Sequence, residues 1–178
     1  VGSEMCIRDS IFGGHVDRHF PSGTIAVTDG PVNASTDSFR IRVHGQSAHA
    51  ARPHEGVDAV VVATLIVTAL QTIVSREVNP AHPSVVTIGK LVSGTAANVI
   101  AAQAVLEGTV RAQESDVRAH LIGSVERIAR VAGQLHGAEI EFELIASTPP
   151  VSNPPEIAAL ARTAAATVVG ADSVTAME

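Results

Sequence analysis

The sequence predicts a mixed α+β domain in which two helices cover one face of a four-stranded antiparallel sheet. Four short segments have the alternating or β-branched pattern of strands, and two longer segments have the periodicity of helices. These six segments follow one another in the order β-α-β-β-α-β. Helices on one face of a four-stranded sheet bury all of these apolar surfaces, so the order indicates a ferredoxin-like fold.

The first strand and helix of this unit carry its clearest patterns. In the strand Phe39–His44, Phe39, Ile41 and Val43 alternate with polar residues, which gives one apolar face. The helix is expected at about residues 57–75, and its apolar residues cover more than one face. A helix that lies on a sheet needs only one apolar stripe, so we expect the excess to form a subunit contact, which predicts a homodimer.

The other elements follow at regular intervals. Strands are expected at Val85–Leu91, Ala104–Arg111 and Glu139–Leu144, and a second helix at Ser115–His136. Ser115 is the predicted N-cap of this helix, and Gly137 is the predicted stop. The apolar stripe expected to face the core consists of Val117, Leu121, Val125, Ile128, Ala132 and Leu135.

The chain is expected to have four parts. Residues 1–10 show neither periodicity and are interpreted as an artefactual leader, and residues 38–146 form the ferredoxin-like domain. Residues 11–30 are read as strand, turn and strand, and residues 33–37 as a polar linker. Residues 11–37 and 147–178 are interpreted as pieces of another domain in a longer protein. In the last piece, Asn153 and Pro154 have the pattern of a helix start.

Composition excludes several classes of protein. The net charge is −6 and the chain has no Trp and no Tyr, which argues against a nucleic-acid-binding protein. No apolar run reaches the ~18 residues of a membrane span. The single cysteine, Cys6, excludes an internal disulfide. We find no signal peptide and expect a cytoplasmic protein.

Two histidine-bearing segments are the candidates for chemistry. The strand that ends at Gly45 leads into a loop with His49, Arg52 and His54, and such a loop can serve chemistry on an anionic or carbonyl substrate. A solvated polar loop remains the alternative. Further upstream, His15 follows two glycines, where the backbone can approach a ligand closely.

Six motifs in order resemble the M20 metallopeptidase family, and most closely its amidohydrolase branch of hippurate hydrolases and N-acyl-amino-acid amidohydrolases. The resemblance extends from Ile11 to the end of the chain. The motifs are Gly14-His15-Val16, Pro21-Ser22-Gly23, Gly45-x-x-x-His49-Ala50-Ala51-x-Pro53-His54, Gln71-x-Ile73-Val74-Ser75-Arg76, Ala97-Asn98-Val99-Ile100 and Gly108-Thr109-Val110-Arg111.

The resemblance implies a role for four residues. It identifies His15 as a metal ligand in a site for two divalent ions, zinc, manganese or similar, with a buried structural histidine as the alternative. His49 would stabilise the oxyanion of the tetrahedral intermediate. Asn98 would donate a hydrogen bond to the substrate, or it is a turn residue. Arg111 would pair with a substrate carboxylate, or it ends a strand in solvent.

The resemblance also implies a lid, or dimerisation, domain at residues 38–146, inserted in a catalytic domain. The family's other metal ligands and its glutamate base are absent from this sequence, so we expect the chain alone to be inactive. The predicted function of the parent protein is hydrolysis of the amide bond of N-acyl amino acids or similar small amides by metal-activated water. The alternatives are a freestanding ferredoxin-like interaction module and a domain that binds a small regulatory ligand.

Overall fold

The structure is a computed structural model that describes residues 11–176. It divides into two compact units, one of residues 33–151 and one formed by the residues before and after them. The sequence placed the ferredoxin-like domain at residues 38–146, so the larger unit is longer at both ends. The two units are described separately.

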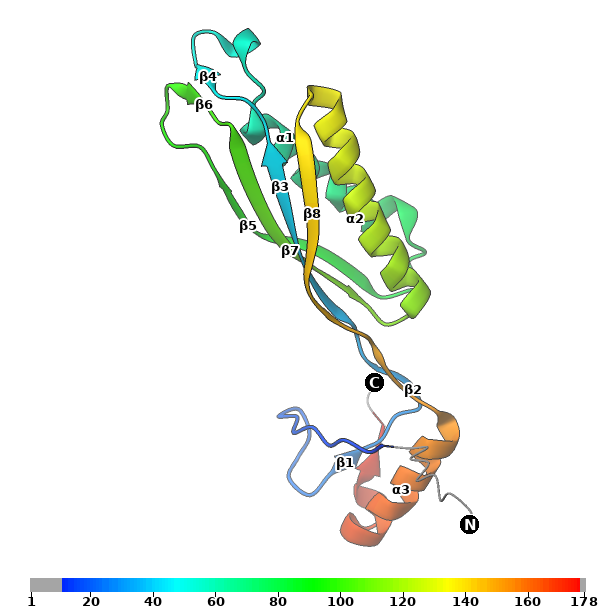
Figure 1. Cartoon of the computed structure of the whole chain (residues 1–178). Coiled ribbons are helices and arrows are strands. Elements are labelled where there is room, and N and C mark those ends of the chain that lie inside the picture. The colour runs from blue at the N-terminus through cyan, green and yellow to red at the C-terminus, as the bar shows by residue number, and fades with distance from the viewer. Residues whose placement is uncertain (1–10, 177–178) are drawn as a thin grey trace, which may run out of the picture. The chain divides into compact units, whose positions relative to one another are not determined.

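The larger unit has the predicted order of elements (Figure 1). Its four main strands lie in the order β5-β7-β3-β8, and every neighbouring pair is antiparallel. This is the ferredoxin-like arrangement, and helices α1 and α2 cover one face of the sheet. The elements are β3 (Thr36–His44), α1 (Ala59–Thr72), β5 (Ser84–Ser93), β7 (Gln103–Ala112), α2 (Ser115–His136) and β8 (Glu139–Thr148).

The alternation in β3 fixes the two faces of the sheet. Phe39, Ile41 and Val43 are buried against the helices. Arg40 and Arg42 point to the other face, because successive side chains of a strand alternate. Strand β3 begins at Thr36, three residues before the predicted start, and its burial alternation begins with Asp37, which is also fully buried.

Helix α1 begins later than predicted because Asp58 caps it. The Asp58 carboxylate accepts hydrogen bonds from the backbone N–H groups of Val60 and Val61, so the regular helix starts at Ala59. At its other end the helix continues as a π-helical turn, Ile73–Glu77. This turn ends with Glu77, whose side chain reaches α2 through Ser124 and Arg127.

The outer side of α1 is apolar, as the sequence predicted. Val60, Val61 and Leu65 remain about 40% exposed. The helical segment Ala59–Glu77 is long and apolar enough to cross a membrane by length and composition, but its inner residues lie in the domain core. The core helix of a soluble protein passes the same test, so this finding by itself is weak evidence for a membrane span.

Helix α2 has the predicted bounds but not the predicted cap or the full predicted stripe. Its N-cap is Glu114, and Gly137 ends it in the left-handed conformation, with φ of 73°. Leu135, expected in the core, is 76% exposed. Gly133 is buried instead, because α2 approaches β8 so closely here that a Cβ atom on Gly133 would lie 2.4 Å from Ile140 Cγ1.

The smaller unit contains the short parallel pair β1 (Ile25–Ala26) and β10 (Val174–Thr175) and the helix α3 (Pro155–Val169). The predicted strand before the turn at residues 21–23 is absent, since residues 11–24 contain no strand. Asn153 is not the cap of α3; that position is Pro154, and the Asn153 side-chain amide donates to the Thr28 carbonyl oxygen at 2.9 Å. A second short pair joins β2 (Gly30–Asn33) and β9 (Val151–Asn153), where the chain passes from one unit to the other.

Candidate functional site

The loop between β3 and α1 is closed at its base by backbone hydrogen bonds. The N–H of Gly45 donates to the carbonyl oxygen of Ala102 at 2.7 Å. Gln46 and Val57, at the two ends of the loop, exchange hydrogen bonds of 2.9 and 3.0 Å. The ten residues between them therefore project from the sheet as one closed loop.

A second pairing joins this loop to the connection between β5 and β7 and places His49 next to Asn98. The short strand β4 (Ala48–His49) pairs with β6 (Val99–Ile100), so that His49 lies opposite Val99. The N–H of Ala50 donates to the Asn98 carbonyl oxygen at 3.0 Å. Two of the predicted site residues, 49 positions apart in sequence, are thus adjacent at one end of the domain, and both are exposed.

The imidazole of His49 is fixed by its own loop. Its Nδ1 accepts a hydrogen bond from the N–H of Ala51 at 3.1 Å. The N–H of Arg52 donates to the His49 carbonyl oxygen at 2.7 Å, which closes a β-turn over residues 49–52. With Nδ1 occupied, Nε2 is the ring atom that remains for a substrate.

Arg111 lies at the opposite end of the sheet. It stands near the end of β7, beside Val85 of β5, and its Nη1 donates to Thr36 Oγ1 at 2.9 Å. The His49 loop begins beyond the other end of this strand, which starts at Gln103. Eight strand residues span about 27 Å. Within one chain, Arg111 is therefore not brought together with His49 and Asn98.

His15, the predicted metal ligand, belongs to the smaller unit and is exposed. Its Nδ1 lies 2.7 Å from the carbonyl oxygen of Val16, which leaves Nε2 available. Among residues 11–176, no three His, Cys, Asp or Glu side chains gather in a way that could hold a metal ion. A catalytic zinc takes about three protein ligands, so the described residues do not form a metal site by themselves.

The other polar residues of the His49 loop are solvated. Arg52 and His54 both approach Glu55, at 3.6 and 3.9 Å, and all three side chains are at least half exposed. Ion pairs of this kind contribute little to stability. The interpretation of Arg52 and His54 as solvated loop residues therefore stands.

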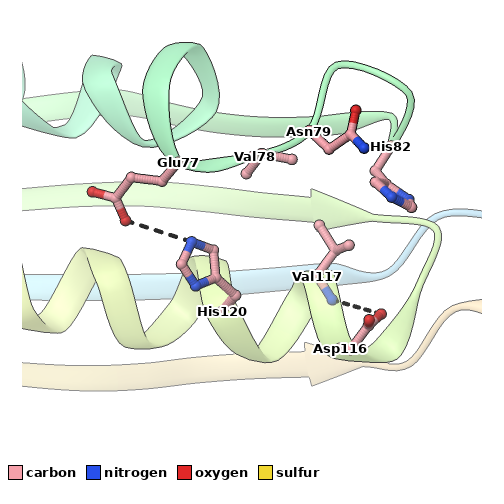
Figure 2. A pocket seen from close by; sticks show the side chains of 7 residues that line it. All are labelled: Glu77, Val78, Asn79, His82, Asp116, Val117 and His120. Carbon is pink, nitrogen blue, oxygen red and sulfur yellow. Dashed lines mark hydrogen bonds and ion pairs between the residues drawn. The ribbon is translucent and has the colours of Figure 1, made fainter.

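A separate hollow lies at the end of the sheet where Arg111 stands, between the α1–β5 connection and the first turns of α2 (Figure 2). Its carboxylates already have partners. Glu77 binds Arg127 and Ser124 and lies 3.5 Å from His120, and Asp116 Oδ1 accepts a hydrogen bond from the N–H of Val117 at 2.8 Å. His82, which also lines the hollow, has its Nδ1 2.5 Å from Oε1 of Glu114. The hydrogen bonds from Arg127 lower the pKa of Glu77 below its ordinary value. The pairs made by Glu77 and His82 link the start of α2 to the segment between α1 and β5.

The open face of the sheet carries alternating charges. Arg40 donates to Glu107 at 2.9 Å and lies 3.3 Å from Glu143, and Lys90 approaches the same Glu107 at 3.3 Å. The hydrogen bond from Arg40 is the main cause of the lowered pKa of Glu107. Since opposite charges are paired across neighbouring strands, this face is a solvated ladder of ion pairs.

Two features of the structure were not predicted from the sequence: a backbone donor to His49 and a buried carboxylate. The N–H of Ala51 is a backbone group, and nothing in the sequence marks it as a partner of His49. Asp37 was placed in a linker, yet it is fully buried. The strand pattern could have found it, because Asp37 continues the spacing of Phe39, Ile41 and Val43.

Comparison with known proteins identifies the family of this chain. The model of the peptidase dimerisation domain of M20 proteins matches residues 34–135, which is more than half of the chain. The chain belongs to the M20 peptidase family. The matched residues coincide with the ferredoxin-like unit from β3 to the end of α2, and they include His49, Asn98 and Arg111.

Individual M20 relatives match beyond this domain. The chain is 38% identical over 163 residues to the N-acetyl-L-cysteine deacetylase of Bacillus subtilis, covering 88% of this chain and 38% of the relative. It is 37% identical over 145 residues to the N-acyl-L-amino acid amidohydrolase of Geobacillus stearothermophilus, covering 82% of this chain and 39% of the relative. The chain thus spans about two fifths of the length of these relatives.

A solved structure of the same family has a similar fold. It is a dinuclear metal-binding peptidase of the M20 family from Bacillus subtilis, which superimposes with a TM-score of 0.71 at 30% sequence identity. The match covers 92% of this chain and 40% of that chain. Both the fold and the family are therefore those that the sequence motifs predicted.

Proposed function

We propose that the intact protein is a metal-dependent amidohydrolase that hydrolyses the amide bond of N-acyl amino acids or similar small amides. The observation that carries this proposal is the adjacent placement of His49 and Asn98 on a domain of the M20 family. The named activities of two relatives, N-acetyl-L-cysteine deacetylase and N-acyl-L-amino acid amidohydrolase, support the substrate class.

The part that this chain plays in the reaction follows from its exposed donors. Hydrolysis of an amide turns the carbonyl oxygen into an oxyanion in the tetrahedral intermediate, and aimed hydrogen-bond donors stabilise that charge. In this proposal His49 Nε2 and the Asn98 side-chain amide donate to the substrate. Arg111 holds the substrate carboxylate with its planar guanidinium.

The metal ions belong to the intact protein. A related M20 peptidase is dinuclear, and we propose that His15 supplies one imidazole to two divalent ions. The described residues alone do not hold a metal, so the chain by itself is proposed to be inactive.

We also propose that the protein is a homodimer through the outer side of α1 and the neighbouring edge strand β5. The family model names the matched domain a dimerisation domain, and Val60, Val61 and Leu65 leave an apolar surface on α1. About 27 Å of strand separates Arg111 from the His49 loop within one chain, and a dimer could bring the two groups together. If both groups act on one small substrate, they come from two copies of the chain.

The alternative function, a freestanding interaction module, accounts for fewer of the observations than an amidohydrolase does. Such a module needs only the ferredoxin-like unit, whereas the match to the N-acetyl-L-cysteine deacetylase covers 88% of the chain and so extends into the flanking unit. The alternative also gives no reason for the fixed position of His49.

The test uses the intact protein, expressed with its flanking sequence. We expect the metal-loaded protein to hydrolyse members of a panel of N-acetyl and N-benzoyl amino acids, and to lose this activity after dialysis against a chelator. Adding zinc or manganese should restore it. His15→Ala should lower the metal bound per chain. A metal-loaded intact protein that hydrolyses no member of the panel would overturn the proposal.

A further inference from the structure

The histidines of the described chain fall into two groups. Five of the eight lie within 4 Å of a carboxylate oxygen, whereas His49, like His15 and His136, has no such neighbour among residues 11–176. Its ring instead receives a hydrogen bond from a backbone N–H group, that of Ala51. The five paired histidines are His19, His44, His54, His82 and His120.

This hydrogen bond determines which ring nitrogen carries the proton. A neutral imidazole has one N–H donor and one bare acceptor nitrogen. Because Ala51 N–H donates to Nδ1 at 3.1 Å, Nδ1 is the bare nitrogen and the proton lies on Nε2. His49 therefore presents a donor to the outside. It is not arranged as a general base, which needs a bare outer nitrogen and commonly has a carboxylate behind the ring.

Two glycines allow the loop to hold this geometry. A Cβ atom on Gly45 would lie 2.2 Å from the carbonyl oxygen of Val57, and one on Gly56 would lie 2.7 Å from the carbonyl oxygen of Gln46. Both clashes are with backbone, which cannot rotate away as a flexible side chain can. Any larger residue at either position would separate Gln46 from Val57 and widen the base of the loop.

A wider loop base would also displace His49, because Gly56 contacts the residue next to it. Gly56 also packs against Ala48, whose Cβ lies 2.9 Å from the position of an added Cβ. Ala48 directly precedes His49 in β4, and the pairing of β4 with β6 sets the position of the ring beside Asn98. A displacement of Ala48 therefore moves His49 away from both Ala51 and Asn98.

We propose that Gly45, Gly56 and the Ala51 N–H group position His49 and hold it as the tautomer protonated on Nε2, so that it acts only as a hydrogen-bond donor. This inference rests on the proposed function for its catalytic meaning. Its structural part concerns the chain alone. Gly45 and Gly56 are positioning residues in this proposal, because they act through the loop that holds His49.

The first test is made on the 178-residue chain, labelled with nitrogen-15, at a pH at which the imidazoles are neutral. We expect a scalar coupling across the hydrogen bond between the Ala51 amide nitrogen and His49 Nδ1, and nitrogen shifts that show Nδ1 bare and Nε2 protonated. The His49→Gln variant identifies the signals. A protonated Nδ1, or the absence of the coupling, would overturn the proposal whether or not the intact protein is a hydrolase.

The second test compares Gly56→Ala with Gly123→Ala in the intact protein. An added Cβ on Gly123 meets no atom within 4 Å, so this variant is a matched control. We expect Gly56→Ala to lower kcat by about 100-fold with little change in KM, because a misplaced donor affects the transition state more than substrate binding. The Gly123→Ala variant should keep its kcat. A folded Gly56→Ala variant with unchanged kcat would contradict the positioning role. An inactive wild type would instead contradict the proposed function.

Discussion

Arg118 of α2 holds both carboxylate oxygens of Asp37 in β3, each at 2.8 Å. Ser147 Oγ donates to the same carboxylate at 2.6 Å from β8, so one buried group joins a helix and two strands. The Asp37 side chain is fully buried and that of Arg118 is 23% exposed. A charge in such a place is tolerated only because its partner is present.

Replacing Arg118 by Met should destabilise the domain by about 3 kcal/mol, because Asp37 would remain buried and unpaired. Urea unfolding of the chain measures this loss. Arg130→Met is the control, since the half-exposed Arg130 pairs with Glu126 on the same helix and donates one 3.3 Å hydrogen bond to the Ile140 carbonyl oxygen, and its loss should cost about 1 kcal/mol. Equal losses in the two variants would mean that burial of Asp37 contributes nothing.

The same pair predicts how stability depends on pH. The hydrogen bond from Arg118 is the main cause of the lowered pKa of Asp37, whose ordinary value is 3.8. The folded state therefore binds this proton less readily than the unfolded state. The resulting stability is fully present above the ordinary value and is lost as the pH falls through the lower folded pKa.

In Asp37→Asn, position 37 cannot titrate, so the variant should be less stable than wild type at neutral pH. The difference in the free energy of unfolding should be constant down to about pH 5 and should shrink below about pH 4. Urea titrations at several pH values measure it. A difference that stays constant down to pH values at which the folded carboxyl is protonated would show that Asp37 does not titrate with folding.

Two glycines of α2 predict opposite effects of the same substitution. Gly133→Ala places a Cβ atom 2.4 Å from Ile140 Cγ1 and 2.8 Å from the Ala138 carbonyl oxygen, and should destabilise by about 1–3 kcal/mol. Gly123→Ala meets nothing within 4 Å and should stabilise by up to about 1 kcal/mol, because Ala favours a helix more than Gly. Thermal unfolding of both variants checks the signs. Stabilisation by Gly133→Ala would show that α2 does not pack this closely on β8.

The sequence predicted the fold where local pattern and tertiary packing agree. Alternation in β3 and the ends of α2 were sufficient to place those elements, and the order of the six elements indicated the correct sheet. Leu135 was misplaced because periodicity identifies apolar residues but does not show that two small residues, Ala129 and Gly133, permit the close approach of a strand. That information lies in the register of β8.

The candidate site was predicted residue by residue, but its arrangement was not. The meeting of His49 with Asn98 depends on two strands of only two residues each, which carry no periodic signal. The separation of Arg111 from them could have been inferred, because Arg111 stands at the far end of a predicted strand. The hydrogen bond from Ala51 to the His49 ring involves a backbone donor that every residue except proline possesses.

The apolar outer side of α1 predicts the oligomeric state. Val61→Glu places a charge in the proposed interface, where its burial would be costly, and should convert a dimer to a monomer without unfolding the domain. Val131→Glu is the control, since Val131 is an exposed apolar residue of α2 and not of α1. Sedimentation equilibrium distinguishes the two. A wild-type chain that stays monomeric at high concentration would contradict a dimer through this surface.

The distance between Arg111 and His49 predicts complementation between two inactive variants of the intact protein. Suppose that each active site takes His49 from one copy and Arg111 from the other. A mixed dimer of His49→Ala and Arg111→Gln then contains one site with both defects and one with neither. Mixing equal amounts under conditions of subunit exchange should restore about a quarter of the wild-type kcat per chain, because half of the dimers are mixed. If both residues acted within one chain, every site in the mixture would carry a defect and no activity would return. Each variant must be shown to be folded and dimeric beforehand, so that recovered activity reports the sharing of sites.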